Sequence, residues 1–213
     1  MQLLLDVAGT LLERRGLHRT ITEVLHRGGQ VVSEAGVAEA HVALSERTDI
    51  PARPTRAFYE QFNASLLRDL GLDPRTDLID EIYVACRELT WQPYPDVTAL
   101  GGLNIPMGIV SNWDDGLEQV LAETIPSLRF DPIIASGAAG VAKPDPEIFE
   151  FALRSVGGSR DGVLYVGDSP RLDIEPATRA GLRAVLIDRE LRYGEFAGET
   201  IRSFEELEGL LRR

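Results

Sequence analysis

The sequence predicts an α/β protein in which a parallel sheet is sandwiched by helices and carries an inserted all-helical domain. Three observations support this fold class. Residues 3–5 form an unbroken apolar run, as is typical of a strand buried on both faces of a parallel sheet, and this run stops at Asp6. Strand-like and helix-like segments alternate from residue 97 onwards. Residues 13 to about 92, by contrast, show no strand-like run and favour helices.

The elements that follow the insert are expected at short intervals along the chain. Strands are predicted near residues 106–111, 130–135, 163–167 and 183–187. Helices are predicted near residues 115–123, 145–156 and 171–181. A last helix is expected to begin at the capping box Ser203-Phe204-Glu205-Glu206.

The helical insert is expected to span residues 13–93, so that the α/β core domain comprises residues 1–12 and 94–213. Residues 49–54 are interpreted as a linker between helices, and residues 91–96 as the hinge back into the core, because each segment holds two prolines. Trp91 and Tyr94 either pack this junction or line a substrate pocket. Apolar side chains recur at helical spacing in three stretches of the insert: Leu17, Ile21, Val24 and Leu25; Phe58, Phe62, Leu66 and Leu70; and Ile79, Ile82, Tyr83, Cys86 and Leu89.

The composition excludes several classes of function. A net charge of −12 at pH 7 opposes a nucleic-acid-binding surface, which should be basic. No apolar run approaches the roughly 20 residues that cross a bilayer, and the N-terminus lacks the basic region of a signal peptide. We therefore expect a cytoplasmic protein with no membrane or nucleic-acid partner. The single cysteine, Cys86, cannot form an intramolecular disulfide, and no zinc-ligand spacing is present.

Polar side chains stand at the ends of several predicted strands. Ser111 and Asp168 each end an apolar run, as Asp6 does, and Asp173 follows five residues after Asp168. Lys143, in the loop before a predicted helix, is the only lysine among the 22 lysine and arginine residues. Because open α/β sheets bind ligands at the carboxyl ends of their strands, we expect these groups to converge. Seen alone, Asp6 would more simply be explained as an acceptor of hydrogen bonds from the turn that follows it.

This ordered set of motifs resembles the haloacid dehalogenase superfamily of aspartate-nucleophile hydrolases. The resemblance covers residues 1–12 and 94–213 and implies a Rossmann-like core, with the helical insert placed as a cap over the nucleophile. It implies that Asp6 attacks the substrate to form an ester intermediate and that Lys143 neutralises the charge that develops there. Ser111 and the backbone amide of Asn112 would donate hydrogen bonds to a transferred phosphate oxygen.

The resemblance also implies a magnesium cofactor, a hard cation that suits carboxylate ligands and substrate oxygens. Asp6, Asp168, Asp173 and the backbone carbonyl of Ala8 would form its site. Asp168 is expected to be a direct ligand, whereas Asp173 acts either through water or by orienting the lysine. Ala8 and Gly9 are further expected to contact the substrate.

Ala8 departs from the pattern of the phosphatases in this superfamily. They normally carry a second aspartate two residues after the nucleophile, which protonates the leaving group and then activates water. A methyl group can do neither, and general acid–base assistance typically contributes about 10²–10⁴-fold to the rate. We therefore expect weakened or atypical acid–base catalysis, for which an acid near the first strand, such as Glu13, is a candidate substitute.

Two branches of the superfamily lack the second aspartate, and the sequence differs from each of them. Phosphonoacetaldehyde hydrolases share the start Asp-x-Ala-Gly-Thr but need a cap lysine for a Schiff base, and this chain has no lysine outside position 143. Haloacid dehalogenases work without a metal and usually lose the first carboxylate of the last motif, whereas this chain keeps both Asp168 and Asp173. Dehalogenation of 2-haloacids stays a minor alternative.

The expected function is therefore that of a Mg²⁺-dependent phosphohydrolase that acts on a small phosphorylated metabolite. The alternative from another class is a non-catalytic module that binds a phosphorylated ligand or a protein on the same fold. No motif of the insert identifies the substrate, and no feature specifies the oligomeric state. Several arginines could meet an anionic substrate or equally form solvated helix faces: Arg14, Arg15, Arg19, Arg53 and Arg56.

Overall fold

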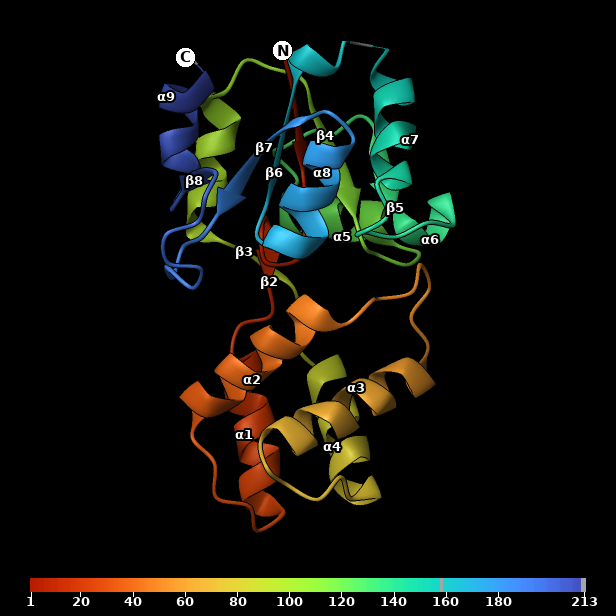
Figure 1. Ribbon diagram of the computed structural model, residues 1–213, viewed down its shortest axis with the longest axis vertical. Coiled ribbons are helices and arrows are strands. Elements are labelled where there is room, and N and C mark those ends of the chain that lie inside the picture. Colours follow the sequence, from red (N-terminus) through yellow and green to blue (C-terminus); the bar gives the residue numbers. More distant parts are fainter. Residues whose placement is uncertain (158, 212–213) are drawn as a thin grey trace. The chain divides into compact units, whose positions relative to one another are not determined.

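The computed structural model describes residues 1–157 and 159–211 and divides the chain into two compact units (Figure 1). The first unit comprises Met1–Glu13, Ile50–Arg53 and Gln92–Arg213, and the second comprises Arg14–Asp49 and Pro54–Trp91. The sheet unit therefore includes three residues that were predicted to belong to the ends of the insert, Glu13, Gln92 and Pro93. It also takes in the middle of the linker at residues 49–54.

The first unit is built on a six-stranded sheet in which every neighbouring pair of strands is parallel. Helices flank this sheet (Figure 1), and the predicted α/β fold class is thereby confirmed. The strand order is β5-β4-β1-β6-β7-β8. The strands are β1 (Gln2–Leu5), β4 (Met107–Ser111), β5 (Ile133–Ala135), β6 (Val163–Gly167), β7 (Arg183–Ile187) and β8 (Glu199–Ile201).

The register of the three central strands positions the candidate site. Leu5 at the end of β1 pairs with Ile109 of β4 and with Val166 of β6. The residue after β1, Asp6, therefore comes level with Val110, one residue before the end of β4, and with Gly167, the last residue of β6. Because parallel strands end at the same edge of a sheet, the polar residues that follow the apolar runs meet there.

One face of the sheet packs against α7 (Glu147–Val156) and α8 (Glu175–Arg179). Side chains alternate between the two faces of a strand, and Leu4 joins this layer while its neighbours on β1 face away. The ring of Tyr165 packs edge-on against Phe149, with 4.8 Å between ring centroids. Each such fully buried side chain contributes roughly 1.5–3 kcal/mol to stability. This layer brings the Tyr165 hydroxyl beneath the carboxyl edge of the sheet.

Several elements of this unit differ from the sequence-based expectations. The strand predicted near residues 130–135 is shorter, because Pro132 has no N–H to donate to a ladder. The helix predicted near residues 171–181 begins as a π-helix, η3 (Pro170–Ile174). The end of the predicted hinge continues into the 3₁₀-helix η1 (Pro95–Gly102). Strand β8 and the antiparallel pair β2 (Leu12–Glu13) and β3 (Gln92–Pro93) were not predicted. The remaining helices are α5 (Leu117–Thr124), α6 (Ser136–Ala139), η2 (Arg160–Gly162), η4 (Phe204–Glu206) and α9 (Leu207–Leu211).

The linker segment Ile50–Arg53 belongs to the sheet unit through contacts near α6. The hydroxyl of Ser136 donates to the carbonyl of Ala52 at 3.0 Å, and Arg53 Nε donates to the carbonyl of Gly137 at 3.0 Å. The chain therefore returns to the sheet unit between two helices of the insert.

The second unit consists of four helices: α1 (Leu17–Arg27), α2 (Glu34–Arg47), α3 (Arg56–Asp69) and α4 (Thr76–Arg87). Two of them begin at side-chain caps, since Ser33 accepts from Gly36 N and Thr55 accepts from Phe58 N. Their inward faces form a separate apolar core of Ile21, Val24, Leu25, Val37, Leu44, Leu66, Leu67, Leu78 and Ile82. None of the helices in the described residues is long and apolar enough to cross a membrane.

Candidate active site

A buried lysine lies at the centre of the carboxyl edge of the sheet. Lys143 is 3 % exposed, and its ammonium donates to Asp6 Oδ1 at 2.6 Å, to Asp173 Oδ1 at 2.5 Å and to the hydroxyl of Tyr165 at 3.2 Å. Burial lowers the pKa of Lys143, but the two carboxylates outweigh burial and raise the pKa above its ordinary value. The ammonium is therefore a fixed positive charge at this site.

The side chain of Asn112 holds the backbone of Lys143 in place. Its Nδ2 donates to the carbonyl of Lys143 at 2.9 Å, and its Oδ1 accepts from the Lys143 N–H at 2.7 Å. From the sequence, only the backbone amide of Asn112 was expected to take part, and this paired contact of its side chain was not predicted. An asparagine directly after the strand-end Ser111 was the one available signal.

Asp6 follows β1 and presents its two carboxylate oxygens differently. Oδ1 accepts from Lys143 and, at 2.9 Å, from the hydroxyl of Ser111. Oδ2 accepts no hydrogen bond from any residue that the structure describes. Burial raises the pKa of Asp6, and the Lys143 ammonium opposes this rise. One oxygen is thus fixed and the other is available to a ligand or substrate.

Both oxygens of Asp173 are occupied by hydrogen bonds from the protein. Oδ1 accepts from Lys143 and lies 2.6 Å from the hydroxyl of Tyr165, while Oδ2 accepts from the N–H of Ser169 at 3.0 Å. Gly167 is required beside it, because a Cβ there would lie 2.3 Å from the Asp173 carboxyl carbon. This arrangement suits the second of the two predicted roles, that of orienting the lysine.

Asp168 is held much more loosely, next to the turn that follows β1. It accepts one long hydrogen bond, 3.4 Å from Thr10 Oγ1. Gly9 packs directly against it with φ of +88°, and a Cβ at Gly9 would lie 2.1 Å from Asp168 Oδ2. Burial, followed by the charges of Asp173 and Asp6, raises the pKa of Asp168 well above its ordinary value.

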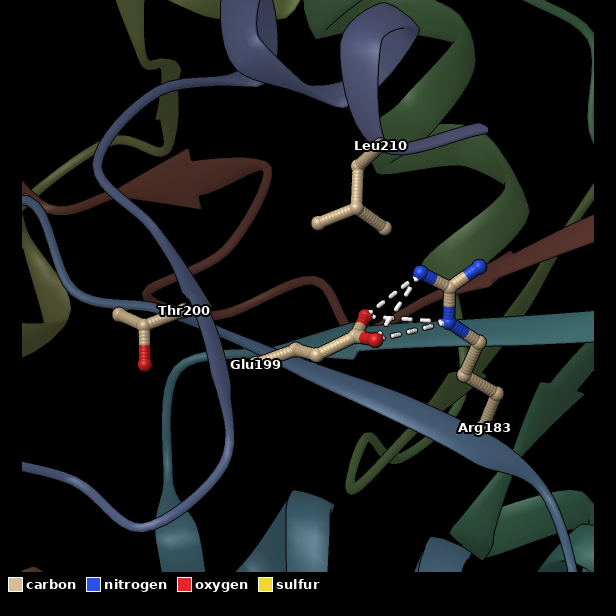
Figure 2. Close-up of a pocket in the computed structure, with 4 residues that line it drawn as sticks. All are labelled: Arg183, Glu199, Thr200 and Leu210. Carbon is tan, nitrogen blue, oxygen red and sulfur yellow. Dashed lines mark hydrogen bonds and ion pairs between the residues drawn. The ribbon is translucent and has the colours of Figure 1, made fainter. Parts of the chain in front are cut away.

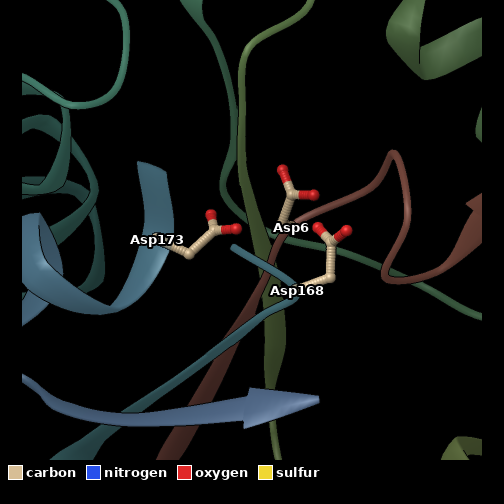
Figure 3. Close-up of side chains that lie close together, drawn as sticks. All are labelled: Asp6, Asp168 and Asp173. Atoms are coloured by element: carbon tan, nitrogen blue, oxygen red, sulfur yellow. The ribbon is translucent and has the colours of Figure 1, made fainter. Parts of the chain in front are cut away.

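The three carboxylates form the one cluster in the described part of the chain that could hold a metal ion (Figure 3). One ligand atom from each of Asp6, Asp168 and Asp173 lies within 4.8 Å of the others. The oxygen donors suit a hard cation such as Mg²⁺. The unpartnered Asp6 oxygen and the raised pKa of Asp168 both indicate that this side of the cluster lacks positive charge. The residues present therefore fit a divalent cation.

Ala8 provides a fixed backbone but no acid. The surrounding turn is held by hydrogen bonds from Gly9 N to the carbonyl of Leu12 and from Leu12 N to the carbonyl of Val7, both 2.8 Å long. Glu13, the candidate substitute acid, lies in β2 opposite Gln92.

The hinge aromatics fall in different units of the structure. Tyr94 belongs to the sheet unit, and its N–H donates to the carbonyl of Leu11 at 3.1 Å. Burial, together with the negative charge of Asp168, raises the pKa of Tyr94 to about 12. Trp91 belongs to the helical unit, where Arg14 lies 4.5 Å above its ring.

The arginines considered for an anionic substrate have varied surroundings. Arg14 packs on an indole ring, Arg53, within the sheet unit, donates to the carbonyl of Gly137, and Arg56 forms ion pairs with carboxylates of α3 and α4. The other two, Arg15 and Arg19, are exposed. The structure thus brings together Asp6, Ser111, Lys143, Asp168 and Asp173, and it adds Tyr165 and the side chain of Asn112 to the predicted set.

Comparison with known proteins agrees with the motifs. A family model described as haloacid dehalogenase-like hydrolase matches residues 2–181, which confirms the resemblance drawn from the sequence. Three curated relatives are phosphatases or nucleotidases by name. Pyrimidine 5'-nucleotidase YjjG of Escherichia coli is 39 % identical over 114 residues, covering 51 % of this chain and 50 % of the relative.

The other two relatives match with similar identity. A glyceraldehyde 3-phosphate phosphatase of Methanopyrus kandleri is 34 % identical over 135 residues, covering 58 % of this chain and 57 % of the relative. A phosphoserine phosphatase of Thermus thermophilus is 43 % identical over 64 residues, covering 30 % and 26 %. The chain spans between a quarter and somewhat more than half the length of these relatives.

Solved structures share the fold over the whole chain. The HAD-hydrolase YfnB from Bacillus subtilis, bound to magnesium, has a TM-score of 0.72 at 20 % identity and covers 100 % of this chain and 98 % of its own. A 2-haloacid dehalogenase from Pseudomonas syringae has a TM-score of 0.61 at 21 % identity, with the same coverage. At this identity, the likeness establishes the fold alone.

Proposed function

Because the chain belongs to the haloacid dehalogenase-like hydrolase family, we propose that it is a Mg²⁺-dependent phosphohydrolase that works through an aspartyl-phosphate on Asp6. The observation that carries this proposal is the asymmetry of the Asp6 carboxylate. Lys143 and Ser111 hold Oδ1, so that Oδ2 is left to attack. The names of the relatives support a small phosphorylated metabolite as the substrate.

In the first step Asp6 Oδ2 attacks the phosphorus atom, and the bond between phosphorus and the ester oxygen breaks. The leaving oxygen departs with the bonding electron pair, and the phosphoryl group stays on the carboxylate. Lys143 stabilises the charge that builds up beside Asp6, and the hydroxyl of Ser111 fixes the carboxylate. In the second step water attacks phosphorus, which releases phosphate and restores Asp6.

The metal would be held by Asp168 and the backbone carbonyl of Ala8, with the Asp6 carboxylate beside it, and Asp6 Oδ2 would then be left for the attack on phosphorus. Asp173 would orient Lys143 rather than bind the metal directly, because both of its oxygens already accept hydrogen bonds from the protein. When bound, Mg²⁺ supplies positive charge to the transferring phosphoryl group. The helical unit is proposed to serve as the cap that selects the substrate.

Ala8 shapes the proposed chemistry, because no side chain at that position can protonate the leaving oxygen. We infer that turnover depends on the acidity of the leaving group, so that acyl and aryl phosphates react faster than alkyl phosphates. The same methyl group favours a second candidate, a module that binds a phosphorylated ligand without turning it over.

The test is a panel of acyl, aryl and alkyl phosphates assayed with Mg²⁺ and with EDTA. The wild type and Asp6→Asn are compared, because asparagine keeps the size of the side chain but cannot attack. Mg²⁺-dependent release of phosphate by the wild type alone supports the enzyme. Equal rates in the two proteins would overturn Asp6 as the nucleophile. Tight binding of phosphate esters without turnover would favour the module, and halide release from 2-chloropropionate would favour a dehalogenase.

A further inference from the structure

Arg189, two residues after β7, binds the turn that follows β1. Its Nη1 donates to the carbonyl of Gly9 at 3.1 Å, and its Nη2 donates to the carbonyl of Thr10 at 2.9 Å. The N–H groups of the same turn are bonded within it: Thr10, Leu11 and Leu12 all donate to the carbonyl of Val7. The carbonyls of Gly9 and Thr10 are thus both satisfied by one side chain that follows a distant strand.

The guanidinium of Arg189 also contacts three other side chains. Asp96 at the start of η1 accepts from Nε at 3.1 Å and from Nη2 at 3.0 Å, a paired contact whose side chains are only 12 % and 18 % exposed. The ring centroid of Tyr94 lies 3.9 Å from Arg189 Cζ, and that of Phe204 lies 5.3 Å from it. A planar fork with these partners has one geometry, which a flexible ammonium could not reproduce.

The opposite side of the turn faces the metal-binding cluster. Gly9 packs so tightly against Asp168 that a single added carbon would clash with it. Thr10 Oγ1 provides the one hydrogen bond that Asp168 accepts in the described structure. A small displacement of this turn would therefore move or release the most loosely held carboxylate of the site.

We propose that Arg189 is a positioning residue for metal binding: it fixes the Gly9–Thr10 turn, and the turn fixes Asp168. This inference rests on the proposed function, because it assigns a role in the same metal site. Residues that orient metal ligands in this indirect way typically change affinity or activity by about 10–100-fold when they are replaced.

The experiment measures the dissociation constant of Mn²⁺, added alone to the full chain, by the EPR signal of the free ion. Arg189→Met removes every donor but keeps an unbranched stem over Tyr94, and we expect its dissociation constant to rise about tenfold or more. Arg189→Lys restores the charge without the planar fork, and it should recover little of the affinity.

Arg183→Met is the matched control. Arg183 forms a paired contact with Glu199, with distances of 2.8–3.2 Å, at the opposite end of β7 (Figure 2). This variant also loses an arginine–carboxylate pair, and its Mn²⁺ affinity should stay within about twofold of the wild type. Asp96→Asn keeps Arg189 but weakens its ion pair, and it should also raise the dissociation constant of Mn²⁺. This variant replaces Arg189→Met if the Arg189→Met protein does not fold.

Unchanged Mn²⁺ affinity in folded Arg189→Met, or in Asp96→Asn if it is used instead, would overturn the inference even if the melting temperature fell. Full recovery in Arg189→Lys would overturn the role of the fork. Absence of Mn²⁺ binding by the wild type would overturn both the proposed metal site and the role of Arg189. Binding that is equal in all variants would overturn the inference on Arg189 alone.

Discussion

The two sides of the candidate site differ in how completely the protein holds their carboxylates. On the lysine side, Asp173 is bound through both oxygens and Lys143 has three partners. On the other side, Asp168 accepts one long hydrogen bond, and the second oxygen of Asp6 accepts none from the described residues. The first side is organised by the chain itself, and the second side has the chemistry of a site that a cation completes.

Removal of the lysine should have the largest effect. Lys143→Met leaves two buried carboxylates without their counter-ion, which costs about 3–5 kcal/mol of unfolding free energy. We expect kcat/KM to fall by about 10³-fold or more, because the positive charge beside the nucleophile is lost. Urea unfolding and steady-state assays on an aryl phosphate measure the two effects.

The sign of the pH dependence sharpens this first prediction. Without Lys143, only the hydrogen bond from Ser111 opposes the rise that burial and the charge of Asp173 cause in the pKa of Asp6. The folded variant then holds protons that the unfolded chain releases, so its deficit in stability should shrink as pH falls from 7 to 5. A deficit that grows over this range would contradict the assignment of the ion pair.

An acid added at position 8 tests the side of the site that lies opposite the lysine. Ala8→Asp supplies a carboxyl group two residues after the nucleophile, and we expect turnover of alkyl phosphates to increase by about 10²-fold or more. Acyl phosphates, whose leaving groups need no proton, should gain little. Ala8→Asn is the matched control of the same size. An equal gain with both substrate types would mean that proton transfer does not limit turnover.

A methyl group added at Gly9 tests the Asp168 side of the site separately from the lysine side. Gly9→Ala adds a carbon that meets Asp168 Oδ2 at 2.1 Å, and we expect the Mg²⁺ concentration for half-maximal activity to rise about 10–100-fold. Gly116→Ala is the control, since Gly116 has a similar φ of +91° but no neighbour within 4 Å of an added Cβ. Both variants carry about 1–2 kcal/mol of backbone strain, so an equal change in Mg²⁺ dependence would refute the clash.

The smallest expected effect is the response of thermal stability to pH. The pKa of Asp168 is raised well above 3.8, so the metal-free folded state binds more protons than the unfolded chain. This contribution to stability is fully present below pH 3.8 and is lost as pH rises through the raised pKa. Bound Mg²⁺ should reduce this loss of stability with rising pH. The check is the melting temperature measured across this pH range with EDTA and with Mg²⁺. The same pH dependence in both conditions would speak against a metal at Asp168.

The features that could be predicted from the sequence are those that leave a local pattern. Each apolar run ends at a polar residue, so the strand ends and the residues Asp6, Ser111 and Asp168 could be recognised together. Lys143 stood out because it is the only lysine. The two-residue strands β2 and β3 are too short to produce a period, and β8 presents exposed residues at an edge.

The contacts that sequence reasoning missed join residues far apart in the chain. The Asn112 side chain bonds to Lys143 across 31 positions, and Arg189 bonds to Thr10 across 179. Tyr165 looks like any aromatic residue of a buried strand, and only the packing of β6 shows that its hydroxyl reaches the lysine. Such pairings depend on strand order and register, which one sequence does not encode as a local signal.

The solitary buried lysine has a practical consequence for reagents that acylate amines. Apart from the terminal amine, the native chain offers such reagents one target, and that target is 3 % exposed. Acetylation at Lys143, followed by mass spectrometry of one peptide, therefore reports directly on how often this end of the sheet opens to solvent. A ligand that covers the carboxyl edge of the sheet should slow this labelling, which gives a screen for substrates that needs no knowledge of the reaction.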